Sequence, residues 1–211
     1  MILTATFDPV LSRVRIHASG LDVLNSNAFF EQNVNGWSAV QGTFVRSTAQ
    51  AHEGVASGLL TPNGTGAVVA AETNPSASPA VTPGQGYTLS GWFLSPTGWG
   101  QVSITVTWLN SANGVISTPA GNVQPLPVGV WTRLTDVVTA PAGAAKALLR
   151  ARMAGTPAVS DVLYVDEMKI GLATVNVERS TDGVRWKTVR GGTARPVVNG
   201  TVVLDDYEFE V

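Results

Sequence analysis

Tryptophan rings are the side chains of this chain best suited to surface chemistry. A flat indole can pack against the C–H face of a sugar while polar neighbours bond its hydroxyls. The 211-residue sequence contains six tryptophans. Trp92 shares the polar side of a predicted strand with Thr88 and Ser90, and Trp99 lies in the Gly/Pro-rich loop 95–100. We interpret Trp92 and Trp99 as candidate ligand-facing rings; the alternatives are loop packing and a subunit contact.

Residues suited to catalysis are few. The two histidines, His17 and His52, are far apart in the sequence and have no partner at a metal-ligand spacing. No nucleophile elbow, His-Glu-x-x-His motif or phosphate-binding loop occurs. We therefore predict that the protein is not an enzyme. Four acidic residues near the C-terminal end are interpreted as a solvated strand end rather than as paired catalytic acids: Asp205, Asp206, Glu208 and Glu210.

Composition and charge indicate which partners the protein is expected to lack and where it is expected to fold. The net charge of −2 and the lack of basic blocks argue against a nucleic-acid surface, and the lack of cysteine excludes disulfides and thiolate metal sites. No apolar run is long enough to cross a bilayer, so we expect no membrane insertion. No secretion signal follows Met1. We expect a chain that folds in a cytoplasm and acts elsewhere as part of a particle released by lysis.

Strand patterns dominate the sequence. Residues 102–109 alternate strictly, with Val102, Ile104, Val106 and Trp108 on one face, which makes Trp108 a core residue. Asn-Gly and Asp-Gly pairs, which suit tight turns, separate the strand candidates. Many short strands with such turns predict an all-β sandwich or barrel. The other strand candidates are 12–18, 86–94, 130–139, 145–152, 162–170, 173–179, 184–190 and 201–204.

Charge density predicts a domain boundary. Residues 1–22 and 172–211 hold 15 charged side chains in 62 residues, whereas residues 23–171 hold 13 in 149. The outer pieces therefore resemble one domain and the middle another. The simplest arrangement is an insertion of the middle domain into a small β-sandwich, in which Trp186 is expected to be the core tryptophan.

The middle segment resembles the CBM4/CBM9-like carbohydrate-binding family. Its matching pieces occur in the family's order: Asn-Ala-Phe-Phe-Glu at 27–31 with Gly-Trp at 36–37, His-Glu-Gly-Val-Ala-Ser at 52–57, the segment 81–92, Trp-Leu-Asn at 108–110, Trp-Thr-Arg-Leu at 131–134, and Leu-Tyr-Val-Asp-Glu-Met at 163–168. This resemblance implies a jelly-roll β-sandwich over residues 23–171. It also implies that Trp37 and Trp131 occupy core positions.

The same resemblance implies a structural calcium ion. Calcium takes six to eight oxygen ligands from carboxylates and carbonyls. Glu31, Glu53 and Asp166 fall on the segments that supply such ligands in the family. The alternative is that these three residues are turn residues or surface charges.

The outer pieces resemble the fibronectin-type or Ig-like modules of minor tail proteins in phages that infect actinobacteria. The similar pieces are Leu-Ser-Arg-Val-Arg-Ile at 11–16, the segment 177–192 and Leu-Asp-Asp-Tyr-Glu at 204–208. The family pattern continues past the last of these with a Tyr-rich strand. We therefore expect the small sandwich to be a truncated domain or one completed by a neighbouring subunit.

Together these resemblances imply a phage minor tail protein, located in the virion, whose jelly roll attaches to a glycan of the host surface. Its expected partners are other tail proteins, further copies of itself and the glycan. Two alternatives stay open. One is a purely structural tail or fibre protein that binds no sugar, and the other is a binding module of a secreted glycoside hydrolase.

Overall fold

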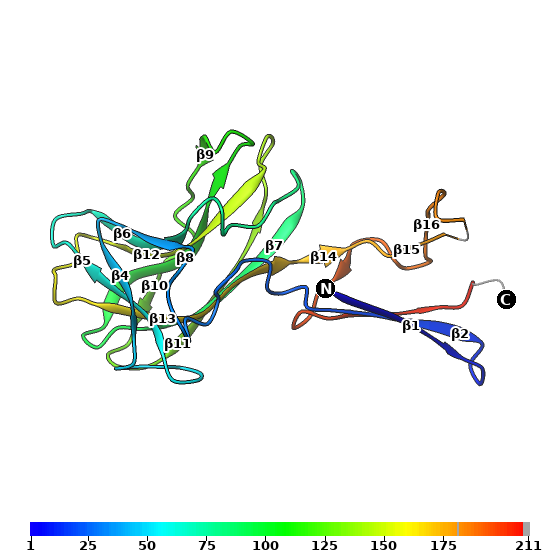
Figure 1. The fold of residues 1–211 in the computed structure, drawn as a ribbon, viewed down its shortest axis with the longest axis horizontal. Coiled ribbons are helices and arrows are strands. Elements are labelled where there is room, and N and C mark those ends of the chain that lie inside the picture. The colour runs from blue at the N-terminus through cyan, green and yellow to red at the C-terminus, as the bar shows by residue number, and fades with distance from the viewer. Residues whose placement is uncertain (181, 209–211) are drawn as a thin grey trace. The chain divides into compact units, whose positions relative to one another are not determined.

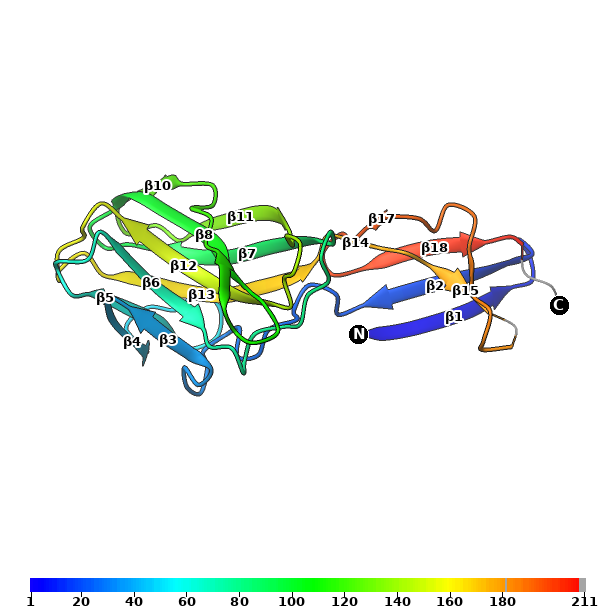
Figure 2. The same ribbon diagram turned by 90° about the horizontal axis from the view of Figure 1, so that it is seen from above.

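The computed structural model describes residues 1–180 and 182–208, which fold into β-strands and loops (Figures 1 and 2). The chain divides into two compact units. The larger is Leu24–Ile170, and the smaller combines Met1–Val23 with Gly171–Val211. Within the described ranges, no helix is long and apolar enough to span a membrane.

The larger unit is a jelly roll of two antiparallel sheets (Figure 2). The first sheet contains, in spatial order, β10 (Gln124–Leu126), β8 (Trp99–Leu109), β12 (Lys146–Ala154), β6 (Val68–Thr73) and β3 (Trp37–Val40), with β9 (Val115–Ser117) beside β8. The second contains β11 (Thr132–Thr139), β7 (Gly86–Leu94), β13 (Leu163–Leu172), β5 (Ser57–Pro62) and β4 (Gly42–Ser47). We call them the six-stranded and the five-stranded sheet.

Alternating side chains fill the core between these sheets. Strand β8 buries the four residues of its predicted apolar face, including Trp108. The five-stranded sheet contributes Leu89 and Phe93 of β7 and Met168 of β13 to the same core. Gly91 is required between them, because a Cβ there would lie 2.4 Å from the Met168 sulfur. The jelly-roll prediction is thus confirmed by a two-layer core with period-two burial.

The other face of β8 is polar but is also buried. Ser103, Thr105 and Thr107 are also buried, because the segment 118–121 lies across them. The Ser103 hydroxyl donates to the carbonyl of Ala120 at 2.7 Å, and the Thr105 hydroxyl to that of Pro119 at 2.8 Å. This segment, which we call the strap, gives the buried hydroxyls the partners that burial demands.

An aromatic cluster closes one side of the larger unit. Phe30 is fully buried and meets the rings of Trp37 and Phe44 at 5.2 and 5.5 Å between centroids. The Trp37 indole N–H donates to the carbonyl of Asn27 at 3.1 Å. Trp37 is therefore a core residue, as predicted, and its polar atom is satisfied.

The smaller unit consists of one sheet and two short ribbons. Its sheet has the order β1 (Ile2–Asp8), β2 (Arg13–Ser19) and β18 (Val202–Asp206). The ribbons are β14 (Thr174–Val175) with β17 (Arg195–Pro196), and β15 (Glu178–Arg179) with β16 (Lys187–Thr188). The second layer of the predicted small sandwich is thus reduced to strands of two residues each.

This reduced second layer leaves Trp186 uncovered. Its side chain is 62% exposed, so the prediction that it is the core tryptophan of the small domain is wrong. The acidic residues at the strand end make ion pairs instead of facing solvent alone. Arg15 pairs with Asp205 at 2.9 Å, and Arg179 with Asp206 at 2.9 Å. Of the other predicted strand-end residues, Glu208 is exposed, and Glu210 lies outside the described residues.

The contrast between Trp37 and Trp186 can be measured as stability. We expect Trp37→Ala to lower the free energy of unfolding by about 3–5 kcal/mol, because it opens a cavity beside Phe30 and Phe44. Trp186→Ala should change it by about 0.5 kcal/mol or less, as is usual for an exposed side chain. Urea unfolding followed by circular dichroism measures both; equal losses would contradict the assignment of core and surface.

Candidate functional site

The outer face of the five-stranded sheet carries the polar side of β7. Thr88, Ser90 and Trp92 are half-buried there, and they alternate with buried residues of the core. On the edge strand β11, Arg133 lies directly opposite Trp92, and Thr135 lies opposite Ser90. Both β11 side chains are exposed. This face therefore combines an indole ring with hydroxyl and guanidinium groups, the combination expected of a sugar site.

A histidine from outside the sheet packs on Trp92. The imidazole of His52 stacks on the indole with 3.8 Å between centroids and an interplanar angle of 15°. It meets Trp131 edge-on at 5.7 Å. Trp131, just before β11, is only half-buried, so its predicted core position is at best partial. We call Trp92, His52 and Trp131 the aromatic triad.

Charged residues of β13 fix the histidine. Nδ1 of His52 lies 2.8 Å from a carboxylate oxygen of Glu167, and the ammonium group of Lys169 donates to the other oxygen at 2.9 Å. Burial raises the pKa of Glu167, but the bonds from Lys169 and His52 outweigh it and hold that pKa below its usual value. Lys169 also lies 4.9 Å above the ring of Phe29. The imidazole is thus held by stacking and by a charged partner.

The backbone of the loop that carries His52 is held by a buried carboxylate. Asp166 is fully buried and accepts hydrogen bonds from the N–H groups of His52 at 3.0 Å and Glu53 at 3.2 Å. Its other oxygen accepts from the N–H of Glu167 at 2.8 Å. Burial nevertheless raises the pKa of Asp166 above its usual value. The carboxylate therefore positions the loop at a cost in desolvation.

A second carboxylate meets the same loop from the other side. The Val55 N–H donates to both carboxylate oxygens of Glu31, at 3.3 and 3.1 Å. Gly54 has a φ of +68°, and a Cβ there would collide with this carboxylate. Only glycine fits between the loop and Glu31 without a shift.

These contacts test the predicted calcium ligands. Asp166 and Glu31 both reach the loop at 52–55, where carbonyl oxygens could supply further ligands. Asp166 has N–H donors but no cationic partner among the described residues. Glu53 is exposed, and no described group of three or more His, Asp or Glu side chains could hold a metal ion. Asp166 and Glu31 therefore hold the backbone of this loop through its N–H groups, and a metal site built from Glu31, Glu53 and Asp166 together does not form among the described residues.

The structure does not bring the two predicted sugar-facing tryptophans into one site. Trp92 belongs to the five-stranded sheet and Trp99 to the six-stranded sheet. The Trp99 indole N–H donates to the carbonyl of Ala154 at 2.8 Å, and the ring lies near Gly155. Trp99 is the first residue of β8 rather than a loop residue, and it is half-buried by these contacts with the end of β12.

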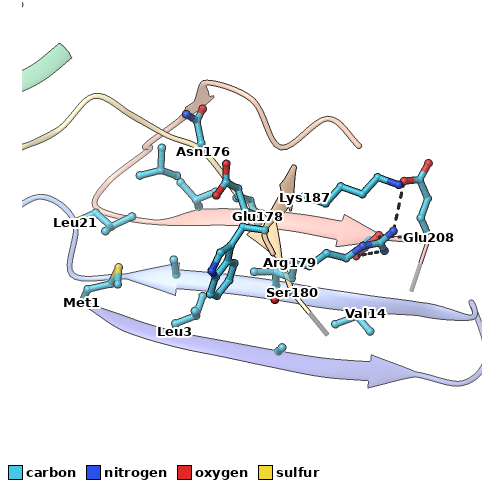
Figure 3. A pocket seen from close by; sticks show the side chains of 18 of the residues that line it. Met1, Leu3, Val14, Leu21, Asn176, Glu178, Arg179, Ser180, Lys187 and Glu208 are labelled. Carbon is cyan, nitrogen blue, oxygen red and sulfur yellow. Dashed lines mark hydrogen bonds and ion pairs between the residues drawn. The ribbon is translucent and has the colours of Figure 1, made fainter. Parts of the chain in front are cut away.

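The smaller unit contains an open cavity between its sheet and the β15–β16 ribbon (Figure 3). Its volume is about 810 Å³. Leu3 and Val14 line it from the sheet, while Arg179 lines it from the ribbon and pairs with Asp206. The exposed ring of Trp186 also lines it. Most of this lining is apolar, which suits a protein segment better than a sugar.

Sequence patterns missed three contributors to the sheet face. His52 had no partner at a metal spacing, because its partners Trp92 and Glu167 are distant in the sequence. Arg133 follows Trp131 at the start of a period-two pattern, a signal that could have placed it on the polar face. Tyr164 is half-buried between the core residues Leu163 and Val165, so alternation places it on the same face.

Comparison with known proteins follows from this fold. No protein-family model matches the sequence, and no curated protein is found as a relative. Among solved structures, the chain is similar to the C-terminal family 22 carbohydrate-binding module of a Clostridium thermocellum xylanase, with 18% identity, a TM-score of 0.54, and coverage of 74% of this chain and 95% of that module.

Two other solved structures bear on the fold. A family 22 xylan-binding domain of Paenibacillus barcinonensis has 17% identity, a TM-score of 0.53, and coverage of 74% and 92% of the two chains. A tailspike protein of bacteriophage CBA120 has 15% identity, a TM-score of 0.51, and coverage of 71% of this chain and 21% of that one. At such identities the likeness concerns the fold. The larger unit thus has the jelly-roll fold of carbohydrate-binding modules.

Proposed function

We propose that the larger unit binds carbohydrate on the outer face of the five-stranded sheet, with Trp92 at its centre. The observation that carries this proposal is the aromatic triad, which stands beside exposed polar groups on one side of a jelly roll. The apolar face of a pyranose packs on such rings, and the hydroxyls of Ser90 and Thr135 are available beside it.

In this proposal His52 is part of the surface on which the sugar packs, and it does not have to move aside for the sugar to bind. Its ring is held by Glu167, and its backbone is held by Asp166. Displacing it would break these bonds, so a sugar gains more by packing on the triad as it stands. The stacked imidazole also limits rotation of Trp92, which reduces the entropy lost on binding.

Arg133 supplies the directional contact. Among the described residues it has no hydrogen-bond or ion-pair partner, and it lies opposite Trp92. Its guanidinium donors are therefore free for the hydroxyls or the carboxylate of a sugar bound at Trp92.

We extend the proposal to the host surface of a phage: the chain is a minor tail protein whose jelly roll attaches the virion to a glycan. Its support is the resemblance of the outer pieces to tail modules, together with the jelly-roll fold in a phage tailspike. Weak single sites would suffice, because many copies on one particle multiply their affinity. A purely structural role is the second candidate, and the open cavity of the smaller unit favours it.

Sugar binding is tested first with xylohexaose and with an array of bacterial cell-wall glycans. We expect Trp92→Ala to reduce the affinity at least tenfold, because one well-packed ring is worth about 1.5 kcal/mol or more. Calorimetry or fluorescence titration measures the loss for any glycan that the wild type binds. Silence of the wild type on all these sugars would favour the structural role.

Matched variants locate the site. His52→Ala should weaken binding about two- to tenfold, because a stacked ring contributes roughly 0.5–1.5 kcal/mol. Trp99→Phe keeps a ring and lies in the other sheet, so it should leave the affinity unchanged. Tighter binding by His52→Ala would instead identify the histidine as a lid, and a loss with Trp99→Phe would move the site.

The tail role makes a separate prediction about location. We expect this polypeptide in purified phage particles, at a fixed number of copies per virion, and an antibody against it should label the tail and reduce adsorption to host cells. Mass spectrometry and immunogold electron microscopy measure this. A chain found only in culture medium, joined to a glycosidase, would support the module of a secreted enzyme.

We also propose that calcium binds at the loop 52–55, with Asp166 and Glu31 among its ligands and loop carbonyl oxygens supplying the rest. The support is the buried carboxylate of Asp166, which lacks a cationic partner in the described chain. Because the folded-state pKa of Asp166 is raised, its contribution to stability is lost as the pH rises through that pKa. A bound cation would offset this cost most at neutral pH.

Calcium addition should therefore raise the melting temperature of the wild type at pH 7 and much less at pH 4. Asp166→Asn should abolish the effect, and Glu53→Gln should leave it intact. Differential scanning calorimetry with and without a chelator measures all three. An unchanged wild-type melting temperature at millimolar calcium would rule out the site.

A further inference from the structure

The edge strand β1 of the smaller unit is unprotected. In the described part of the chain it pairs only with β2, so its other edge presents free backbone N–H and C=O groups. Natural edge strands are usually guarded by Lys, Pro or a bulge. Strand β1 has the sequence Ile-Leu-Thr-Ala-Thr-Phe-Asp, and its register with β2 is continuous. It therefore contains none of these guards.

The opposite edge of the same sheet is guarded. Strand β18 carries Asp205 and Asp206, and the two carboxylates stand on opposite faces of the strand. Two such strands would bring like charges together if they paired. The smaller unit thus has one edge that resists association and one that permits it.

Strand β1 also carries apolar side chains that are partly exposed to solvent. Leu3 is 62% exposed and Phe7 is 51% exposed, and both share one face of the strand with Ala5. Leu3 and Ala5 line the cavity of about 810 Å³ shown in Figure 3. A partner at this edge would gain backbone hydrogen bonds and apolar contacts at once.

We propose that β1 pairs antiparallel with β1 of a second copy of this chain, about a two-fold axis at Ala5. In this register Leu3 lies opposite Phe7 of the second copy, Thr4 opposite Thr6, and Ala5 opposite Ala5. Apolar residues then meet apolar residues on the cavity face, and threonines meet threonines on the other. The only charge on the strand, Asp8, lies opposite Ile2, so no like charges face each other.

The area is sufficient for a specific contact. Covering Leu3, Phe7 and the strand edge on both copies removes on the order of 1,000 Å² from water, near the lower size of specific interfaces. The three-stranded sheets of the two copies would join into one continuous sheet across the dimer. Its two-fold symmetry is the commonest symmetry of homo-oligomers. A contact at this small end of the size range should form reversibly, with an affinity set by how well the paired strands fit rather than by area. The proposal does not depend on sugar binding.

Charge pairing at the two-fold axis tests the register. The wild-type chain should sediment as a concentration-dependent dimer in analytical ultracentrifugation. Ala5→Lys alone and Ala5→Glu alone should each be monomeric, because like charges would meet at the axis. An equimolar mixture of the two variants should dimerise again. Val203→Lys, on the guarded strand β18, is the matched control and should dimerise like the wild type.

Two results would overturn the proposal: a wild type that stays monomeric at several hundred micromolar, or a mixture that fails to dimerise. Ala5 is exposed, so its variants should fold, and unchanged far-ultraviolet circular dichroism and melting temperatures establish that they do. If a variant unfolds, the double variants Thr4→Lys/Thr6→Lys and Thr4→Glu/Thr6→Glu repeat the test, because each brings like charges together in this register while their mixture brings opposite charges together. Dimerisation of Ala5→Lys by itself would exclude this axis.

Discussion

The buried carboxylate of Asp166 is the constraint on which the candidate sugar site depends. It holds the backbone at His52 and Glu53, and these bonds set where the loop crosses the sheet. The stacking of His52 on Trp92 is a consequence of that placement. The stacked rings of His52 and Trp92 lie on the outer face of the five-stranded sheet, yet their arrangement depends on the buried carboxylate of Asp166. Burial raises the pKa of that carboxyl group, so the charged form that holds the loop is costly to keep in the interior.

The two units use β-structure in opposite ways. The larger unit closes its core between two sheets and leaves a polar face to solvent. The smaller unit has one sheet, two ribbons of two-residue strands and an apolar sheet face that the ribbons cover only in part, which leaves an open cavity. The larger unit is therefore closed on itself, whereas the smaller unit leaves part of its apolar surface open to solvent.

Sequence patterns anticipated the elements with strong alternation. The segments 86–94 and 102–109 were predicted as strands, and β7 and β8 occupy them. Strands β5 and β6 gave no such signal, because successive residues in each are buried and their polar and apolar residues do not alternate. The boundary predicted from charge density lies within two residues of the boundary between the compact units. Trp186 was misjudged because the sequence does not show how little second layer the smaller unit has.

The strap 118–121 makes the two outer faces of the jelly roll different. By occupying the hydroxyls of Ser103 and Thr105, it makes the outer side of β8 part of the interior and removes it from contact with large ligands. On the five-stranded sheet, by contrast, Thr88, Ser90 and Trp92 remain half-buried on the outer side of β7. The two faces of the sandwich are therefore unlike, because the strap closes the outer side of β8 whereas the outer side of β7 leaves an indole ring beside polar groups in contact with solvent.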